Sequence, residues 1–222
     1  MKDIKKIAPS LLACMLFMGG CWDDKLLKDT SFVLSSGHDF GPDGKVKGTY
    51  TTPNADNYPS STIVTTTNGH TIREVIINLN AKVAESLDVS KLKVIFFEDK
   101  LVEKNGIFDY VDIDLKDPQN PLSPYIAVTE GKSEPYFTDP IPNQGIPSEY
   151  YLNLIRANIN EGIFTDVNVF KSSRVFHNEG SDLVVPYMKK SQDKTPIAGG
   201  LALFDGGKFT GKTLNINESS LY

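Results

Sequence analysis

Cys21 is the residue whose type and setting point most directly to a chemical event. It follows a short basic start, with Lys2, Lys5 and Lys6, and an apolar run over residues 7–20, an arrangement typical of a secretory signal peptide. The run is too short to cross a bilayer as a helix, which needs about 20 residues. Because small residues precede Cys21 at the expected cut, we predict that a lipoprotein signal peptidase cleaves before it and that its sulfur is acylated.

Acylation at Cys21 would decide where the protein works. Residues 1–20 would be removed as a lipoprotein signal peptide, and two acyl chains on Cys21 would anchor the remainder stably in membrane lipid. We therefore expect the chain on the outer face of a bacterial membrane, away from cytoplasmic ATP and NAD. Two alternatives stay open: a secreted protein with a chance cysteine, and acylation of Cys14, whose apolar run covers only residues 7–13.

A second candidate for chemistry is the segment 206–213, Gly-Gly-Lys-Phe-Thr-Gly-Lys-Thr, which matches the phosphate-binding pattern G-x-x-x-x-G-K-[ST]. Such a loop binds phosphate when it joins a strand to the N-terminus of a helix. Here the flanking residues have the pattern of a β-hairpin. Only nine residues follow Thr213, too few for a strand with a magnesium-binding aspartate. We therefore predict a hairpin and no nucleotide binding.

Neither the acidic nor the histidine side chains have the spacing of a metal or catalytic site. A run of carboxylates could attract calcium, but calcium needs converging oxygens around a tight glycine turn, so we expect a solvated helix face and its following loop. These carboxylates are Asp109, Asp112, Asp114 and Asp117. The histidines, His38, His70 and His177, lie far apart in the sequence, without a metal-type partner at short spacing. Because a G-x-S-x-G nucleophile turn is also missing, we predict no metal, no cofactor, no catalytic residue and no enzyme activity.

The composition is that of a globular protein without disulfide bonds. The 222 residues are 40% hydrophobic and carry a net charge of −5. Removal of residues 1–20, whose net charge is +2, would leave 202 residues near −7 and no second cysteine. A chain of that length buries roughly 70% of its unfolded surface. The negative charge argues against nucleic acid as a partner, which requires clustered lysine and arginine.

The elements that would carry these residues are strands mixed with helices. The expected strands are 30–36, 45–52, 92–97, 124–129, 183–188, 197–204 and 209–214. A turn at Gly41-Pro42-Asp43-Gly44 would join the first two strands. Residues 53–69, which are rich in Pro, Ser, Thr and Asn, predict mostly loop, and residues 135–147, with four prolines, predict loop over part of their length.

Helical spacing of apolar residues identifies the helices. One begins at Thr71, where Glu74 completes a capping box, and its apolar face continues to Val83. Further helices are expected at 100–115, interrupted by Gly106, at 148–160 and at 165–177. The fold class is therefore α+β in one domain: a mixed sheet with antiparallel hairpins at both ends, a βαβ-like middle and about four packed helices.

Several segments, taken in order, resemble the C subunits of spore nutrient germinant receptors, the Ger(x)C family of lipoproteins. They are Cys21-Trp22-Asp23-Asp24, Leu26-Leu27-Lys28-Asp29, Phe32-Val33-Leu34, Ser35-Ser36-Gly37-His38-Asp39, the helix from Thr71 before Leu92-Lys93-Val94-Ile95, residues 106–118, and residues 198–211. The family's glycine-x-aspartate strand end is matched by Gly37-His38-Asp39. Its G-x-A-x-F-x-x-x-K-x-x-G hairpin explains the apparent phosphate-binding loop.

The resemblance covers residues 21–214 and is to the family's N-terminal domain, so residues 21–222 are assigned as a Ger(x)C-like N-terminal domain. Asp24 stands where family members usually have a basic residue. Family members continue into a C-terminal region that is absent after Tyr222, and we therefore expect a truncated or split member.

The resemblance implies a non-enzymatic lipoprotein subunit of a spore nutrient germinant receptor. It would act in receptor assembly and germination on the outer face of the inner spore membrane, beside the A and B membrane subunits. The main alternative is a solute-binding lipoprotein that delivers a nutrient to a transporter. Such proteins need two lobes around a cleft, and this chain has material for one. An envelope hydrolase is a third possibility, for which the sequence offers no catalytic set.

Overall fold

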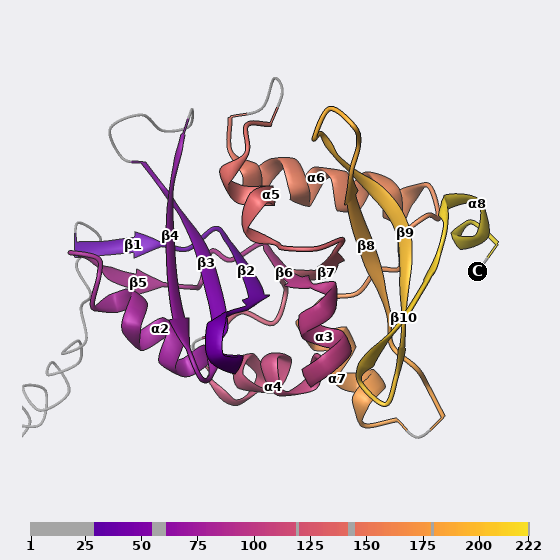
Figure 1. The fold of residues 1–222 in the computed structure, drawn as a ribbon, viewed down its shortest axis with the longest axis horizontal. Helices are drawn as coiled ribbons and strands as arrows, with labels where there is room; N and C mark the ends of the chain where they lie inside the picture. The colour runs from indigo at the N-terminus through magenta and orange to yellow at the C-terminus, as the bar shows by residue number, and fades with distance from the viewer. Residues whose placement is uncertain (1–28, 55–60, 119, 142–144, 179, 222) are drawn as a thin grey trace, which may run out of the picture. The chain divides into compact units, whose positions relative to one another are not determined.

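An eight-stranded mixed sheet is the centre of the fold (Figure 1). The computed structural model describes residues 29–54, 61–118, 120–141, 145–178 and 180–221, and Ser31–Tyr222 forms one compact unit. The strands are β1 (Thr30–Phe32), β2 (Ser35–Phe40), β3 (Val46–Pro53), β4 (Thr62–Gly69), β5 (Ser86–Asp88), β6 (Val94–Glu98), β7 (Tyr125–Thr129), β8 (Val184–Lys190), β9 (Pro196–Asp205) and β10 (Lys208–Leu214).

The sheet is parallel at its centre and antiparallel on both flanks. Its order is β10-β9-β8-β7-β6-β2-β3-β4, and β1 pairs with β5 in a separate two-stranded sheet. Strands β2, β6, β7 and β8 run parallel. Antiparallel strands β3 and β4 extend the β2 side, and β9 and β10 extend the β8 side. The prediction of a mixed sheet with antiparallel hairpins at both ends is confirmed.

The described helices cover both faces of the sheet. They are α2 (Ile72–Asn80), α3 (Asp99–Asn105), α4 (Phe108–Lys116), α5 (Glu134–Thr138), α6 (Pro147–Asn160), α7 (Val169–Phe176) and α8 (Ile216–Ser219), and a short 3-10 turn, η2, spans Pro42–Gly44. Helices α2, α3, α4 and α7 contribute to the hydrophobic cluster on one face, and α5 and α6 to the cluster on the other. Figure 1 shows α5 and α6 on the side of the sheet opposite α2 and α4.

Alternation along β6 explains why the fold has two hydrophobic clusters. Successive strand residues point to opposite faces, so Ile95 and Phe97 pack with α2, α3 and α4, whereas Val94 and Phe96 pack with α5 and α6. All four side chains are almost fully buried. The near-continuous apolar run Val94–Phe97 is the pattern of a central parallel strand covered on both faces, and β6 ends at the polar residue Glu98.

Local signals placed most helices correctly. Thr71 caps α2 by accepting a hydrogen bond from the backbone N–H of Glu74, as predicted. The Glu74 carboxylate accepts from the backbone N–H of His70 instead of Thr71, so the predicted capping box forms only in part. Helix α2 ends at Asn80, so Val83 lies beyond it. The predicted helix at 100–115 is divided at Gly106 into α3 and α4.

The prediction of loop over 53–69 is wrong for its second half, which forms the eight-residue strand β4. Its Thr-Ile-Val-Thr-Thr-Thr run consists of β-branched residues, which favour strands. The predicted strand at 30–36 is also divided, because Val33 donates its N–H to Asp88 while Leu34 donates to Thr51. The chain therefore passes from the small sheet to the large one at these two residues.

Candidate functional site: the carboxyl edge of the parallel strands

Three parallel strands end side by side at one edge of the sheet. Their last residues are Phe40 in β2, Glu98 in β6 and Thr129 in β7. In sheets with parallel strands, this carboxyl edge is where ligands and reactive side chains usually gather. We therefore take the carboxyl edge of β2, β6 and β7 as the candidate site.

Asp39 is the buried acid at this edge, and it holds the start of helix α5. Its side chain accepts hydrogen bonds from the backbone N–H groups of Ser133, at 2.6 Å, and Glu134, at 3.1 Å. The first N–H groups of a helix have no partner inside the helix, and a carboxylate is a favourable partner there. Asp39 therefore fixes the first turn of α5 against the end of β2.

Gly37 allows α5 to approach the sheet closely. A Cβ atom at this position would lie 2.4 Å from Ser133 Oγ and 2.7 Å from a ring carbon of Phe137, both too close for real side chains. Gly37 and Asp39 are two residues apart, so they face the same side of the sheet. The Gly-x-Asp pattern at the end of β2 thus has a structural role, because the glycine makes room for α5 and the aspartate caps it.

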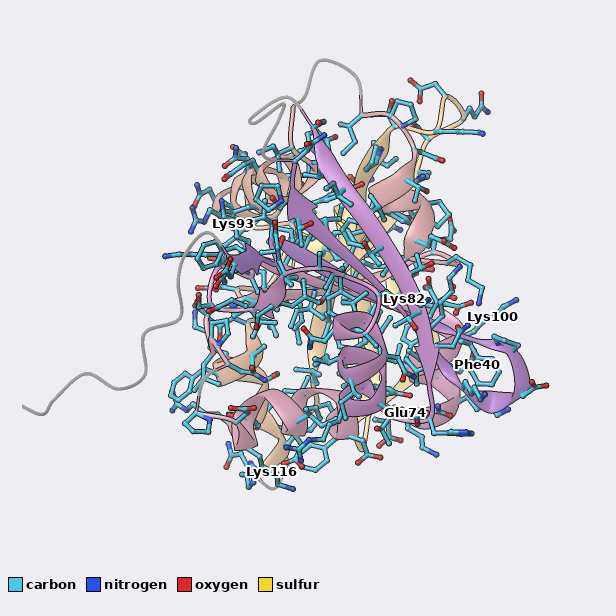
Figure 2. The ribbon with its side chains drawn as sticks, turned by 90° about the vertical axis from the view of Figure 1, so that its left-hand side faces the viewer. Phe40, Glu74, Lys82, Lys93, Lys100 and Lys116 are labelled. Atoms are coloured by element: carbon cyan, nitrogen blue, oxygen red, sulfur yellow. The ribbon has the colours of Figure 1, made fainter. Side chains whose placement is uncertain are left out.

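Glu98 is the second buried carboxylate at the edge. It is 3% exposed and accepts hydrogen bonds from the backbone N–H of Phe40, at 2.5 Å, and from Lys132 Nζ, at 3.0 Å. Lys132 also donates to the carbonyl of Phe40, whose position at the end of the β2–β3 hairpin is labelled in Figure 2. One lysine therefore ties the β7–α5 loop to the ends of β2 and β6.

Ion pairs at the rim of the edge hold α5 from both sides. Lys47 on β3 lies 2.5 Å from Glu134, and Lys190 on β8 lies 2.8 Å from Asp139. The hydrogen bond from Lys190 lowers the pKa of the Asp139 carboxyl. Because all four side chains keep some contact with solvent, each pair stabilises the fold only modestly.

The chemistry available at the carboxyl edge is therefore structural. Burial raises the pKa of the Asp39 carboxyl, although the N–H groups of Ser133 and Glu134 favour its charged form. Both buried carboxylates are engaged by backbone N–H groups, so neither is poised as a base over an open cavity.

The side chain of His38 lies on the opposite face of β2 from those of Gly37 and Asp39. Its ring packs against Tyr50 and Phe97, with centroid distances of 5.8 and 5.4 Å. Burial lowers the pKa of His38 to about 3, so the ring is neutral at physiological pH. It is a core side chain and does not meet His70 or His177.

The predicted lipid-attachment residue Cys21, its alternative Cys14 and the expected signal peptide at 1–20 lie outside the described residues. Their assignment stays a prediction. Within the part of the chain that the structure describes, no helix is long and apolar enough to cross a membrane.

The phosphate-binding pattern at 206–213 forms a hairpin, as predicted. Strand β9 pairs antiparallel with β10 around Gly206 and Gly207, whose φ angles of 52° and 81° suit a tight turn. Phe209 is buried within β10 and stacks near Tyr187. The segment joins two strands, and its Lys212 and Thr213 lie within β10 instead of at the start of a helix, so the phosphate-binding geometry is missing.

The acidic run at 109–117 lies on helix α4 and just after it. Asp112 pairs with Lys116 one turn along the helix, at 2.5 Å. Over the described ranges, no group of three or more His, Cys, Asp or Glu side chains is arranged to hold a metal ion. One shallow depression of about 560 Å³ lies beside α7, and none of its lining residues belongs to the carboxyl edge.

Sequence reasoning did not identify Glu98, Lys132 or the contact of Asp39 with α5. Asp39 and Ser133 are 94 residues apart, and no local pattern joins them. The available signal was the glycine-x-aspartate strand end, which could be quoted only through a family resemblance and had no physical explanation without the fold.

Comparison with known proteins agrees with that resemblance. Residues 23–190 match the model of the spore germination protein N-terminal domain. The chain is 25% identical over 212 residues to spore germination protein GerQC of Bacillus cereus, covering 95% of this chain and 58% of that protein. It is also 25% identical over 194 residues to spore germination protein B3 of Bacillus subtilis, covering 83% of this chain and 51% of that protein.

The chain spans about half the length of the curated relatives it matches. A solved structure, the crystal structure of the GerBC protein, aligns with 89% of this chain and 56% of its own, at 17% identity and a TM-score of 0.41. The family match covers three quarters of the sequence, including the Gly-x-Asp strand end and the loop that it anchors. The chain therefore belongs to the Ger(x)C family of spore germination proteins, through that family's N-terminal domain.

Proposed function

We propose that this chain is a non-enzymatic lipoprotein subunit of a spore nutrient germinant receptor. It acts in receptor assembly and germination on the outer face of the inner spore membrane. The observation that carries the proposal is the match of residues 23–190 to the N-terminal domain of spore germination proteins. The carboxyl edge supports a non-enzymatic role, because its buried carboxylates Asp39 and Glu98 accept hydrogen bonds that hold α5 and the β7–α5 loop in place.

Membrane attachment through Cys21 is part of the proposal. The basic start, the apolar run at 7–20 and the small residues before Cys21 support cleavage and acylation there. Partners within the receptor are the A and B membrane subunits, which would contact the folded domain above the bilayer. A stable contact of this kind commonly buries about 800 Å² on each partner.

Labelling with a fatty acid tests the anchor. We expect label on the unsubstituted chain and on Cys14→Ala, and none on Cys21→Ala, which should accumulate as the unprocessed precursor. Label that persists in Cys21→Ala and disappears in Cys14→Ala would move the anchor to Cys14.

Capture of the tagged chain from detergent-solubilised inner spore membranes tests the receptor assignment. Recovery of the A and B subunits with the chain is the expected result, and Cys21→Ala is the matched control with reduced recovery. Recovery with a solute transporter instead, together with binding of a nutrient by the chain alone, would favour the solute-binding lipoprotein.

A further inference from the structure

Strand β4 is an edge of the large sheet and is long and regular. Its eight residues pair with β3 without a register shift, from Thr62 opposite Pro53 to Gly69 opposite Val46. The other edge strand, β10, is irregular, because its register with β9 shifts between Phe209 and Thr213. A regular edge strand offers unpaired backbone groups to another chain, whereas an irregular one resists pairing.

Two side chains from the α2 region cover one half of the β4 edge. Lys82 Nζ donates to the carbonyl of Thr66 at 2.9 Å, and Asn78 Nδ2 donates to the carbonyl of Asn68 at 3.0 Å. Figure 2 shows Lys82 beside this long strand. The carbonyls of Thr66 and Asn68 therefore point away from β3, and their outward hydrogen-bonding positions are occupied.

In an antiparallel pair, the backbone groups of successive residues point alternately toward the partner strand and away from it, and this alternation leaves the other half of the β4 edge unpaired. Ser61 accepts a hydrogen bond from Asn54 across the ladder, so odd-numbered residues direct their backbone groups toward β3 and even-numbered ones direct theirs outward. Thr62 and Val64 thus present their N–H and C=O groups at the edge. No residue in the described ranges bonds to these outward groups.

The open half also lacks the usual features that protect an edge. Residues 62–65, Thr-Ile-Val-Thr, contain no charged residue and no proline, the two residue types that most often prevent edge-to-edge pairing. Ile63 is 50% exposed. An uncharged, β-branched edge with an exposed isoleucine is suited to receive another strand.

We propose that the open half of β4 pairs antiparallel with the same residues of a second copy of this chain. A twofold axis midway between the two copies of Ile63 places Thr62 opposite Val64 of the second copy and Val64 opposite its Thr62. The outward N–H and C=O groups of both residues then form four hydrogen bonds between the copies. Ile63 lies opposite its own counterpart, so its exposed side chain is covered by an identical one.

A second copy fits this edge because the pairing is self-complementary. Like charges directly opposite each other destabilise a strand pair, and residues 62–65 bring none together. The pairing also stops before Thr66, so Lys82 keeps its hydrogen bond in both copies. The contact is short and well below the area of a stable dimer, so the association is weak and is best detected by covalent trapping.

Disulfide trapping in membranes of cells that produce the full chain tests the proposal. Ile63 and its counterpart form a non-hydrogen-bonded pair, whose Cα atoms lie about 4.5 Å apart, within the range for a disulfide. Under mild oxidation, Ile63→Cys should give a species of twice the chain's mass. Band intensity is normalised to total chain on a reducing gel.

Three controls distinguish the proposed pairing from background oxidation, random collision and another register. The unsubstituted chain, with Cys14 and Cys21, measures background. Ile77→Cys, at an α2 position that is 61% exposed, measures random collision. Thr65→Cys lies on the same strand and face, but this register separates its copies by four residues, about 14 Å, so it should give a much weaker band. Equal bands from Ile63→Cys and either control, or a conjugate of Ile63→Cys with a protein of another mass, would overturn the proposal.

Discussion

At the scale of single residues, the contact between Asp39 and the start of α5 links two distant parts of the sequence. Its carboxylate receives two backbone N–H groups in a buried setting. Gly37 beside it leaves the space that Ser133 and Phe137 occupy. Hydrogen bonds to a charged group contribute more than neutral ones, about 1.5–3 kcal/mol each. The Gly-x-Asp pair therefore fixes how α5 sits on the sheet.

Asp39→Asn should lower the free energy of unfolding by about 2–3 kcal/mol. The amide keeps one acceptor oxygen but directs its NH₂ group toward a backbone N–H, which leaves a buried donor unpaired. A lower urea midpoint at an unchanged slope is the expected readout. Asp43→Asn is the matched control, since Asp43 is exposed in the turn of the same hairpin, and its change should stay within about 0.5 kcal/mol. Equal losses in the two variants would contradict the role assigned to Asp39.

His38 should make the stability of the fold depend on pH. Burial lowers the pKa of His38 to about 3 in the folded chain. Below about pH 6.5, the ordinary pKa of histidine, His38 therefore binds a proton in the unfolded chain while it stays neutral in the folded one. The free energy of unfolding contributed by this residue is therefore fully present above pH 6.5 and is lost as pH falls toward 3. Within that window the loss is about 1.4 kcal/mol per pH unit.

Urea unfolding at several pH values between 6.5 and 4 measures this contribution. His38→Phe keeps an aromatic ring between Tyr50 and Phe97 and removes the titrating group, so its stability should fall less with acid than that of the unsubstituted chain. His70→Phe, at an exposed position, should keep the original dependence. Parallel curves for His38→Phe and the unsubstituted chain would show that His38 is protonated in the folded state.

At the scale of elements, the residues that match a phosphate-binding sequence form the β9–β10 hairpin. Lys212 is exposed on β10, so Lys212→Ala should change stability by less than about 0.5 kcal/mol. Mg-ATP should leave the unfolding temperature unchanged. A true site at 100 times its dissociation constant would add about 2.7 kcal/mol, so a clear thermal shift that Lys212→Ala removes would contradict the hairpin interpretation.

Elements with local signals could be predicted from the sequence. The Thr71 cap, the break at Gly106 and the Gly206-Gly207 turn each depend on neighbouring residues, and each occurs where the sequence places it. Strand β4 was missed because its threonines follow a segment rich in turn-forming residues. Threonine serves both loops and strands, and pairing with β3 decides between them.

The candidate site was harder to predict than the elements around it. Asp39 lies three residues beyond the predicted strand at 30–36, and its partners come from the β7–α5 region. Lys132 is one of many lysines in the sequence, and only the fold brings it to Glu98. Contacts over such separations depend on strand order, which local patterns do not encode.

At the scale of the whole molecule, the sheet joins two antiparallel flanks through a parallel centre. The order β8-β7-β6-β2 places the end of β2 next to β6, so the β2–β3 hairpin and the β7–α5 loop meet at one edge. The buried acids Asp39 and Glu98 hold parts of the domain together, and β4 forms an edge of the sheet. Such a domain is suited to assembly within a larger complex, which agrees with the proposed role as a receptor subunit.

Nutrient-triggered germination of spores that lack this chain tests the receptor assignment most directly. The deletion should abolish or strongly slow the response to at least one nutrient, while a trigger that bypasses nutrient receptors still germinates the spores. Re-expression of the unsubstituted chain should restore the response, and Cys21→Ala should restore it poorly. Deletion spores that respond normally to every nutrient that germinates the parent strain would contradict the assignment.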